Sequence, residues 1–121
     1  MTAFDIWLQL YGKAWKQRNP DLIKDLFASN ATYSEKPFSP PFKGIEEITK
    51  YWQGVSNTQN DISFEYQIIS ESTETCVAHF EASFIRQPGN VKVSLNGIFL
   101  VKFNSENKCT GFSEWWQSQK S

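Results

Sequence analysis

A phenol and a carboxylate lie two positions apart in the segment 27–41, FASNATYSEKPFSPP, and could form one wall of a ligand pocket. Residues 31–35 favour a short strand, and three prolines stiffen the loop that follows. Because side chains alternate across a strand, we expect Tyr33 and Glu35 on the same face. A carboxylate at such a position can accept a polar group of a ligand or move a proton.

Three amphipathic helices are predicted in the first half of the chain. Apolar residues recur at intervals of three and four between residues 4 and 18, which is one face of a helix. A short second helix follows Pro20, and a third follows Gly44. Beyond residue 60 the pattern changes to alternation. The alternating runs cover approximately residues 61–70, 75–86, 91–103 and 108–117. The sequence therefore predicts an α+β domain with helices on one face of an antiparallel sheet.

Length and charge exclude several classes of protein. We expect the 121 residues to form one domain, 1–121. The 13 acidic and 12 basic residues give a net charge of -1, so no basic excess favours nucleic acid or an anionic membrane as a partner. No apolar run is long enough to span a bilayer and no secretory leader is recognisable, which favours a soluble, cytoplasmic protein.

Metal and cofactor sites are not expected. Cys76 and Cys109 follow no metal or redox spacing and are expected to pack as reduced, apolar thiols. The six glycines form no phosphate-binding loop. His79 alternates with apolar neighbours on the expected outer face of the sheet, where a surface or dimer-interface role is favoured over catalysis.

The order of these elements resembles the nuclear transport factor 2-like superfamily, and in particular its SnoaL-like members. Four motifs, in chain order, carry the resemblance. The first runs from Trp15 through Arg18-Asn19-Pro20-Asp21 to Leu26-Phe27, and the second is residues 31–35. The third is Gly97-Ile98-Phe99 and the fourth is Glu114-Trp115-Trp116. The resemblance covers nearly the whole chain. It implies a cone-shaped, cystatin-like roll in which a strongly curved, mixed or antiparallel sheet wraps three helices and leaves a cavity open at one end. It also implies a homodimer through the outer sheet face.

The ketosteroid isomerases of this superfamily give the sharpest chemical comparison. Their Leu-Phe-Ala-x-x-Ala-Thr-x-x-acid pattern resembles residues 26–35 and places Glu35 at their general base. The same register places Tyr11 at the phenol that binds the enolate oxygen. Phe99 occupies the position of their protonated acid, so one oxyanion donor is missing. This departure argues against steroid isomerase activity itself.

Glu114 is a candidate substitute for the missing acid. If the last strand keeps the family register, Glu114 points into the cone between Phe112 and Trp116. Aromatic surroundings would raise its pKa, so that Glu35 and Glu114 could divide base and acid roles. The limonene-epoxide-hydrolase branch is disfavoured, because the two arginines end a helix and a strand and fit no Asp-Arg-Asp arrangement.

Each candidate also has a purely structural interpretation. Tyr11 and Trp15 lie one turn apart on a helix that must bury an apolar stripe. Glu35 is also compatible with a solvated position at the rim. A one-residue bulge would turn Glu114 to solvent and exchange it with Trp115.

Two functions remain open at this level. One is binding of a small hydrophobic or polycyclic ligand in an apolar pocket, which the loss of a donor at Phe99 favours slightly. The other is cofactor-free acid/base catalysis of the isomerase or cyclase type, with Glu35 as base, Tyr11 as hydrogen-bond donor and Glu114 as acid. The residues expected to line the pocket are Trp15, Tyr33, Phe38, Trp52, Phe80, Phe99, Phe112 and Trp116.

Overall fold

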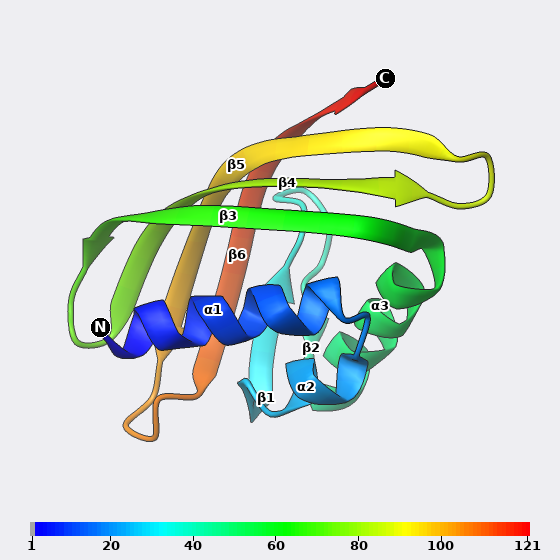
Figure 1. Ribbon diagram of the computed structural model, residues 1–121. Coiled ribbons are helices and arrows are strands. Elements are labelled where there is room, and N and C mark those ends of the chain that lie inside the picture. The colour runs from blue at the N-terminus through cyan, green and yellow to red at the C-terminus, as the bar shows by residue number, and fades with distance from the viewer. Residues whose placement is uncertain (1) are drawn as a thin grey trace.

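The structure, a computed structural model, describes residues 2–121 and has the predicted α+β architecture (Figure 1). Its helices are α1 (Ala3–Lys16), α2 (Pro20–Lys24) and α3 (Gly44–Thr58). Its strands are β1 (Phe27–Ser34), β2 (Phe42–Lys43), β3 (Gln59–Glu71), β4 (Thr75–Arg86), β5 (Val91–Phe103) and β6 (Cys109–Lys120). All three helices precede the four long strands, as the periodicity predicted.

Local sequence signals set where the helices begin and end. The Thr2 side chain accepts a hydrogen bond from Asp5 N and caps α1. Asn19 caps α2 in the same way, and Pro20 occupies the first helical turn. Helix α1 ends at Lys16, two residues earlier than expected, because Arg18 adopts the left-handed conformation common beyond helix ends, with φ of 56°.

One mixed sheet carries all six strands, in the order β2-β1-β6-β5-β4-β3. Strands β3 to β6 form the predicted antiparallel meander. Strand β1 pairs with β6 in parallel, and the two-residue β2, which the sequence did not predict, pairs with β1. Strand β1 begins earlier than expected, at Phe27, and ends at Ser34, so that Glu35 lies immediately after its end.

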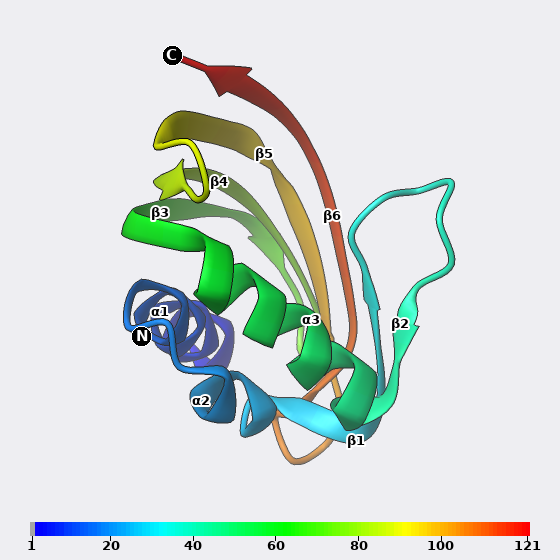
Figure 2. The ribbon, with the colours of Figure 1, turned by 90° about the vertical axis from the view of Figure 1, so that its right-hand side faces the viewer.

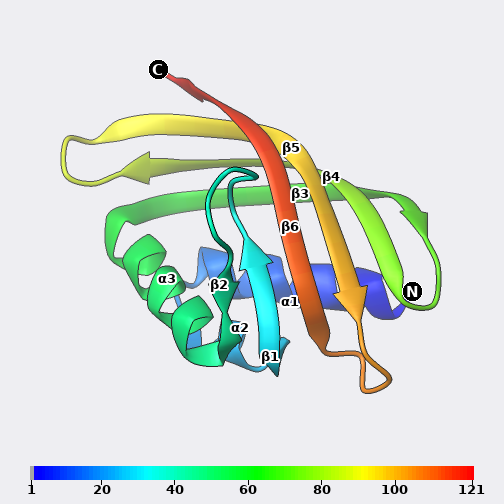
Figure 3. The ribbon, with the colours of Figure 1, turned by 180° about the vertical axis from the view of Figure 1, so that it is seen from behind.

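The sheet is strongly curved and its concave side holds the helices. Figure 2 shows β5 and β6 arching over α1 and α3, and Figure 3 shows that no helix covers the opposite face. Tyr11 of α1 lies at the centre of the core, stacked between Trp7 and Phe112 at centroid distances of 5.3 and 5.4 Å. Stacked aromatic rings thus join α1 to the first part of β6 and position the phenol of Tyr11.

No helix of residues 2–121 is long and apolar enough to cross a membrane. The thiols of Cys76 and Cys109 are both buried and unpaired. Burial raises the pKa of Cys76 to about 11 and that of Cys109 to about 12, so both stay protonated at neutral pH.

Candidate functional site

A small cavity lies between the concave face of the sheet and helices α1 and α3. Its volume is about 80 Å³. The lining residues are Tyr11, Trp15, Tyr33, Glu35, Tyr51, Trp52, Val55, Gln59, Phe80, Phe84, Arg86, Leu95, Glu114 and Trp116. The interior thus holds a ligand-sized space only for a molecule of a few non-hydrogen atoms.

A chain of hydrogen bonds crosses the floor of the cavity. The hydroxyls of Tyr11 and Tyr33 lie 3.1 Å apart. Tyr33 Oη donates to Glu114 Oε2 at 3.3 Å, and Trp116 Nε1 donates to Glu114 Oε1 at 3.0 Å. Strands β1 and β6 and helix α1 therefore bring two phenols and one carboxylate into a single connected group.

Glu114 is the buried titratable group of this site, with 8% of its surface exposed. Burial away from water raises its pKa from 4.5 to about 8, and the nearby Glu35 charge adds to this, while the bonds from Trp116 and Tyr33 act in the opposite direction. Strand β6 keeps an unbroken register with β5 from Gly111 onward, so no bulge turns Glu114 outward. The carboxyl group therefore carries a proton near neutrality, in the direction that the aromatic surroundings predicted.

The phenols respond to the same environment. Burial, followed by the charge of Glu114, raises the pKa of Tyr11 and of Tyr33 well above 10. Both hydroxyls therefore keep their protons over the physiological pH range and act as hydrogen-bond donors or acceptors, not as bases.

Glu35 lies at the half-exposed edge of the cavity and is held by helix α3. Tyr51 Oη donates a hydrogen bond to Glu35 Oε2. The Tyr51 ring stacks on Phe42 of β2, with centroids 4.8 Å apart, and this contact fixes the ring at the mouth. Tyr33 and Glu35 do line the same cavity, as the alternation of the strand predicted.

Indole rings form much of the remaining wall. Trp15 Nε1 donates to Gln59 Oε1 at 2.8 Å, so this ring is fixed by β3. Trp52 of α3 meets Tyr11 edge to face, with centroids 5.4 Å apart. Its buried Nε1 has no hydrogen-bond partner within residues 2–121. An unpaired buried donor is costly, and a bound water or ligand oxygen would satisfy it.

Two arginines lie near the site, and only one lines it. The exposed Arg86 ends β4 and places its guanidinium over the Phe84 ring, 5.7 Å from the centroid. Arg18 Nε donates to the backbone oxygen of Ser56 at 2.8 Å, which joins α1 to α3. The cavity wall thus has one cationic side chain, at its exposed rim.

The structure places most of the predicted site residues around this cavity. Glu35, Tyr11 and Glu114 line it together with Trp15, Tyr33, Trp52, Phe80 and Trp116. Phe99 and Phe112 are buried behind Tyr11 in the core and do not line it. The prediction that Phe38 lines the pocket is wrong. Its side chain is fully exposed in the loop between β1 and β2, because that loop extends beyond the edge of the sheet (Figure 2).

Several lining residues were missed from the sequence. Tyr51 follows Ile48 and precedes Val55 at helical spacings, so the periodicity of α3 contained the signal for it. Gln59 and Arg86 face each other across β3 and β4 at the ends of these strands. Which strand end meets the cavity depends on the curvature of the sheet, and no local pattern in the sequence encodes that curvature.

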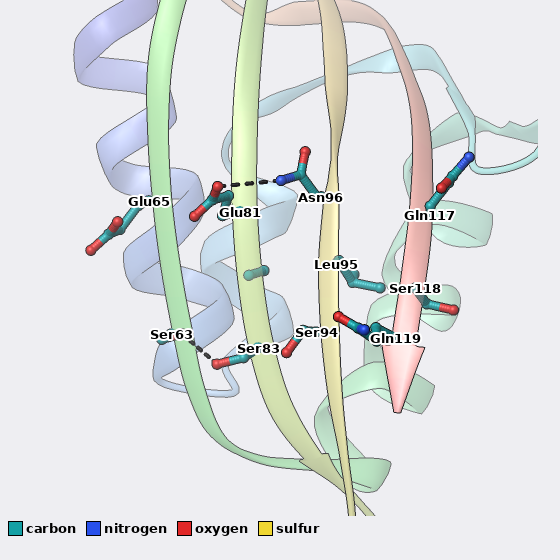
Figure 4. Close-up of a pocket in the computed structure, with 11 residues that line it drawn as sticks. Ser63, Glu65, Glu81, Ser83, Ser94, Leu95, Asn96, Gln117, Ser118 and Gln119 are labelled. Carbon is teal, nitrogen blue, oxygen red and sulfur yellow. Dashed lines mark hydrogen bonds between the residues drawn. The ribbon is translucent and has the colours of Figure 1, made fainter. Parts of the chain in front are cut away.

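A larger hollow, of about 710 Å³, lies on the outer face of the sheet (Figure 4). It is an open trough lined mainly by short polar side chains, and its carboxylates Glu65 and Glu81 are exposed. His79 borders it and bonds Asn96 through Nε2 at 2.8 Å, and Asn96 in turn donates to Glu81. These contacts confirm the outer-face position of His79. We place the candidate site in the smaller interior cavity, which contains the buried carboxyl group and the phenols.

Within residues 2–121, no group of three or more His, Cys, Asp or Glu side chains is arranged to hold a metal ion.

Comparison with family models matches residues 8–111 to the SnoaL-like domain. The chain belongs to the SnoaL-like domain family. The match includes residues 8–16 of α1, all of β1, α3 and β5, and only the start of β6 in this SnoaL-like protein. No protein of curated function matches the sequence closely enough to count as a relative.

Solved structures share the fold of this SnoaL-like protein at low sequence identity. The epoxide hydrolase/cyclase-like enzyme SalBIII, which has a role in pyran ring formation in salinomycin, has a TM-score of 0.82 at 14% identity, covering 93% of this chain and 89% of its own. A ketosteroid isomerase-like protein from Catenulispora acidiphila, in complex with trimethylamine, has a TM-score of 0.79 at 13% identity, covering 90% and 83%. A designed 17-OHP binder has a TM-score of 0.84 at 13% identity, covering 96% and 94%. Such identities show the common fold.

Proposed function

We propose that this SnoaL-like protein binds a small organic molecule in the interior cavity. The observation that carries the proposal is the carboxyl group of Glu114, buried among aromatic rings and bonded to Tyr33 and Trp116. Burying an ionisable group costs free energy that a purely structural core avoids with apolar residues. A polar group of this kind at the floor of a cavity is typical of a ligand-binding site.

The size of the cavity narrows the ligand class. Pockets for drug-sized ligands measure roughly 300–1,000 Å³, whereas this cavity measures about 80 Å³. A molecule of a few non-hydrogen atoms therefore fits better than the polycyclic ligand expected from the sequence. The trimethylamine bound by the Catenulispora acidiphila protein is of this small size and supports the same ligand range.

Acid/base catalysis is the second candidate function. It is favoured by the two carboxyl groups of one cavity, which have different environments. Glu114, with its pKa raised to about 8, can hold a proton at neutral pH, while Glu35 reaches the half-exposed mouth. Glu35 would remove a proton beside a carbonyl, and the Tyr11–Tyr33–Glu114 chain would donate hydrogen bonds to the developing enolate oxygen. No cofactor takes part in this scheme.

Cyclopentanone is a suitable probe of both candidates, because it is small and has exchangeable protons beside its carbonyl. Its binding is measured by NMR chemical-shift changes of the cavity residues Tyr11, Trp52 and Glu114. Val55→Phe at the mouth is expected to reduce binding, while the matched Val77→Phe on the outer face leaves it unchanged. Shift changes confined to the outer face would overturn the proposed binding site.

The catalytic candidate is tested with the same compound in D₂O. We expect the protein to accelerate exchange of the protons beside the carbonyl, and Glu35→Gln to remove this acceleration. Equal exchange rates for the wild type and Glu35→Gln would eliminate Glu35 as the base and leave the binding function standing.

We further infer that the outer face of the sheet forms a homodimer. Val77, Leu100, Ile98 and Trp115 are neighbours in the register of β4, β5 and β6 and form an apolar patch beside the polar trough. Trp115 is 46% exposed, which is unusual for a large aromatic ring. A second copy of this patch is a self-complementary partner. Cytoplasmic location stays a prediction from the sequence.

A further inference from the structure

The wall of the interior cavity is dominated by aromatic rings. They are contributed by Tyr11, Trp15, Tyr33, Tyr51, Trp52, Phe80, Phe84 and Trp116. The rings come from α1, α3 and three strands of the sheet, β1, β4 and β6, so they surround the space from several sides. Aromatic rings have a negative electrostatic potential over their faces, and surrounding rings form the cage that recognises alkylated ammonium ions.

The charged groups of the cavity point to the same ligand class. Two carboxyl groups, Glu35 at the mouth and Glu114 at the floor, line a space whose one cationic residue is the exposed Arg86. The field of an exposed guanidinium is weakened by water and salt, whereas a carboxylate 8% exposed acts through a medium of lower dielectric constant. Once Glu114 has released its proton, the acidic groups therefore dominate the interior field.

The size of the cavity sets the upper limit for such an ion. A volume of about 80 Å³ accepts a compact group such as a methylated ammonium head, and a longer chain would have to extend past the half-exposed Glu35. A cation with an apolar surface is the species that fits both the aromatic rings and the carboxyl groups. Cation–π contacts are stronger where the ion is removed from water, as it would be in this cavity.

We propose that the interior cavity binds a small alkylammonium ion, held between the aromatic rings and the carboxyl groups of Glu35 and Glu114. This inference rests on the proposed binding function of the same cavity and names its ligand class. The ion pairs with the Glu114 carboxylate, and the proton of the carboxyl group leaves to solvent. Each cation that binds therefore releases one proton.

The release of a proton makes the affinity depend on pH. Glu114 faces Tyr33 of β1, Tyr11 of α1, Tyr51 of α3 and the carboxylate of Glu35. The three phenols have their pKa values raised well above 10 by burial, so they keep their protons below pH 9. Glu114, with a pKa near 8 in the empty cavity, is the group that releases a proton. Affinity for a permanently charged ion should therefore rise by up to tenfold per pH unit and level off above about pH 8.

Tetramethylammonium and tert-butanol form a suitable pair of probes, because both are compact, carry three or more methyl groups and differ in charge. Binding is measured by calorimetry and by NMR shifts of the cavity residues, at pH 6 to 8.5. We expect tetramethylammonium to bind at least fivefold more tightly than tert-butanol at pH 8, and its affinity to rise with pH. Calorimetry in two buffers of different ionisation enthalpy should detect proton release.

Three glutamate variants locate the effect. Glu114→Gln and Glu35→Gln should each weaken tetramethylammonium binding severalfold and leave tert-butanol binding within twofold. Glu114→Gln should also remove the pH dependence. The matched change Glu81→Gln, on the outer face, should alter neither ligand. Arg86→Gln should strengthen tetramethylammonium binding, because it removes the opposing charge at the rim.

Two results would overturn the inference. In the first, the wild type binds tert-butanol as tightly as tetramethylammonium, or more tightly. In the second, the wild type binds neither probe. In the first case the cavity still binds a small molecule and the proposed function stands. In the second case the cyclopentanone experiment decides whether the proposed function fails as well. If Glu114→Gln does not fold, the comparison of the two probes in the wild type and Glu35→Gln decides the inference.

Discussion

Tyr51 of helix α3 donates a hydrogen bond to Glu35, which lies just beyond the end of β1, and this bond joins the two edges of the cavity mouth. The Tyr51 ring also lies 5.3 Å from the ring of Tyr33, centroid to centroid. The half-exposed carboxylate at the mouth is therefore connected through one aromatic residue to the phenol on the floor.

The bond between Tyr51 and Glu35 should be measurable as a coupling energy. Tyr51→Phe keeps the ring that stacks on Phe42 and removes the hydroxyl. We expect it to lower the free energy of unfolding by about 1 kcal/mol, at the low end for a bond to a charged group because the pair is partly exposed. A double-mutant cycle with Glu35→Gln, followed by urea denaturation, measures the interaction. Additive effects would show that the bond contributes nothing.

Glu114 should make the stability of the protein fall as the pH rises. Its pKa is about 8 in the folded state and 4.5 when solvated, so between these values the folded chain holds a proton that the unfolded chain has lost. The free energy of unfolding then decreases with pH by up to about 1.4 kcal/mol per unit between about pH 4.5 and 8, and this dependence ends above pH 8.

Urea denaturation at pH 5, 6.5 and 8 tests this dependence. The wild type should lose stability relative to Glu114→Gln over this range, because glutamine cannot ionise. The exposed outer-face variant Glu81→Gln should keep the slope of the wild type. If the difference between the wild type and Glu114→Gln were constant with pH, Glu114 would not carry a raised pKa.

Much of this fold could be predicted from the sequence because its elements have clear periodicities. The helix around Trp7, Tyr11 and Trp15 and the three strands between residues 75 and 117 have strong patterns, and the structure confirms them. The parallel pairing of β1 with β6 was not predicted, because it joins segments far apart in the chain through backbone bonds that no side-chain pattern specifies.

The site could be predicted only where a helix or strand with a regular period sets the position of a residue. Tyr11 and Glu114 point into the cavity because α1 and β6 keep their periods up to these positions. Phe38 was wrongly assigned to the pocket wall, because the proline-rich loop has no period and leaves the sheet. The volume of the cavity depends on how the indole rings of Trp15 and Trp52 pack against each other, with centroids 5.7 Å apart, which the sequence does not encode.

Gly97 should be intolerant of any side chain, because β6 passes very close to it. A Cβ at this position would meet the backbone oxygen of Trp115 and would lie 2.7 Å from Trp116 Cα. We expect Gly97→Ala to lower the free energy of unfolding by about 1–3 kcal/mol, because backbone atoms cannot move aside as a flexible side chain can.

Gly54 is the matched control for this substitution. It is exposed in α3, and a Cβ there meets nothing within 4 Å. Gly54→Ala should raise the free energy of unfolding by about 0.5–1 kcal/mol, because alanine loses less conformational freedom in a helix. Thermal denaturation of both variants checks the opposite signs, and a stable Gly97→Ala would contradict the close approach of β6.

Trp115 should decide whether two copies associate. It faces outward from β6, opposite Ile98 of β5, and removal of its exposed ring from water would be a main source of binding free energy in a dimer through this face. We expect the wild type to sediment at twice 14.0 kDa at micromolar concentration.

Trp115→Lys should weaken the dimer at least tenfold, because two like charges would then be buried near the two-fold axis. Phe38→Lys removes an even more exposed aromatic residue from the loop beyond the sheet and should leave the dimer intact. A wild type that sediments as a single 14.0 kDa species would rule out association through this face, and equal weakening by both variants would indicate a contact that is not specific to the sheet.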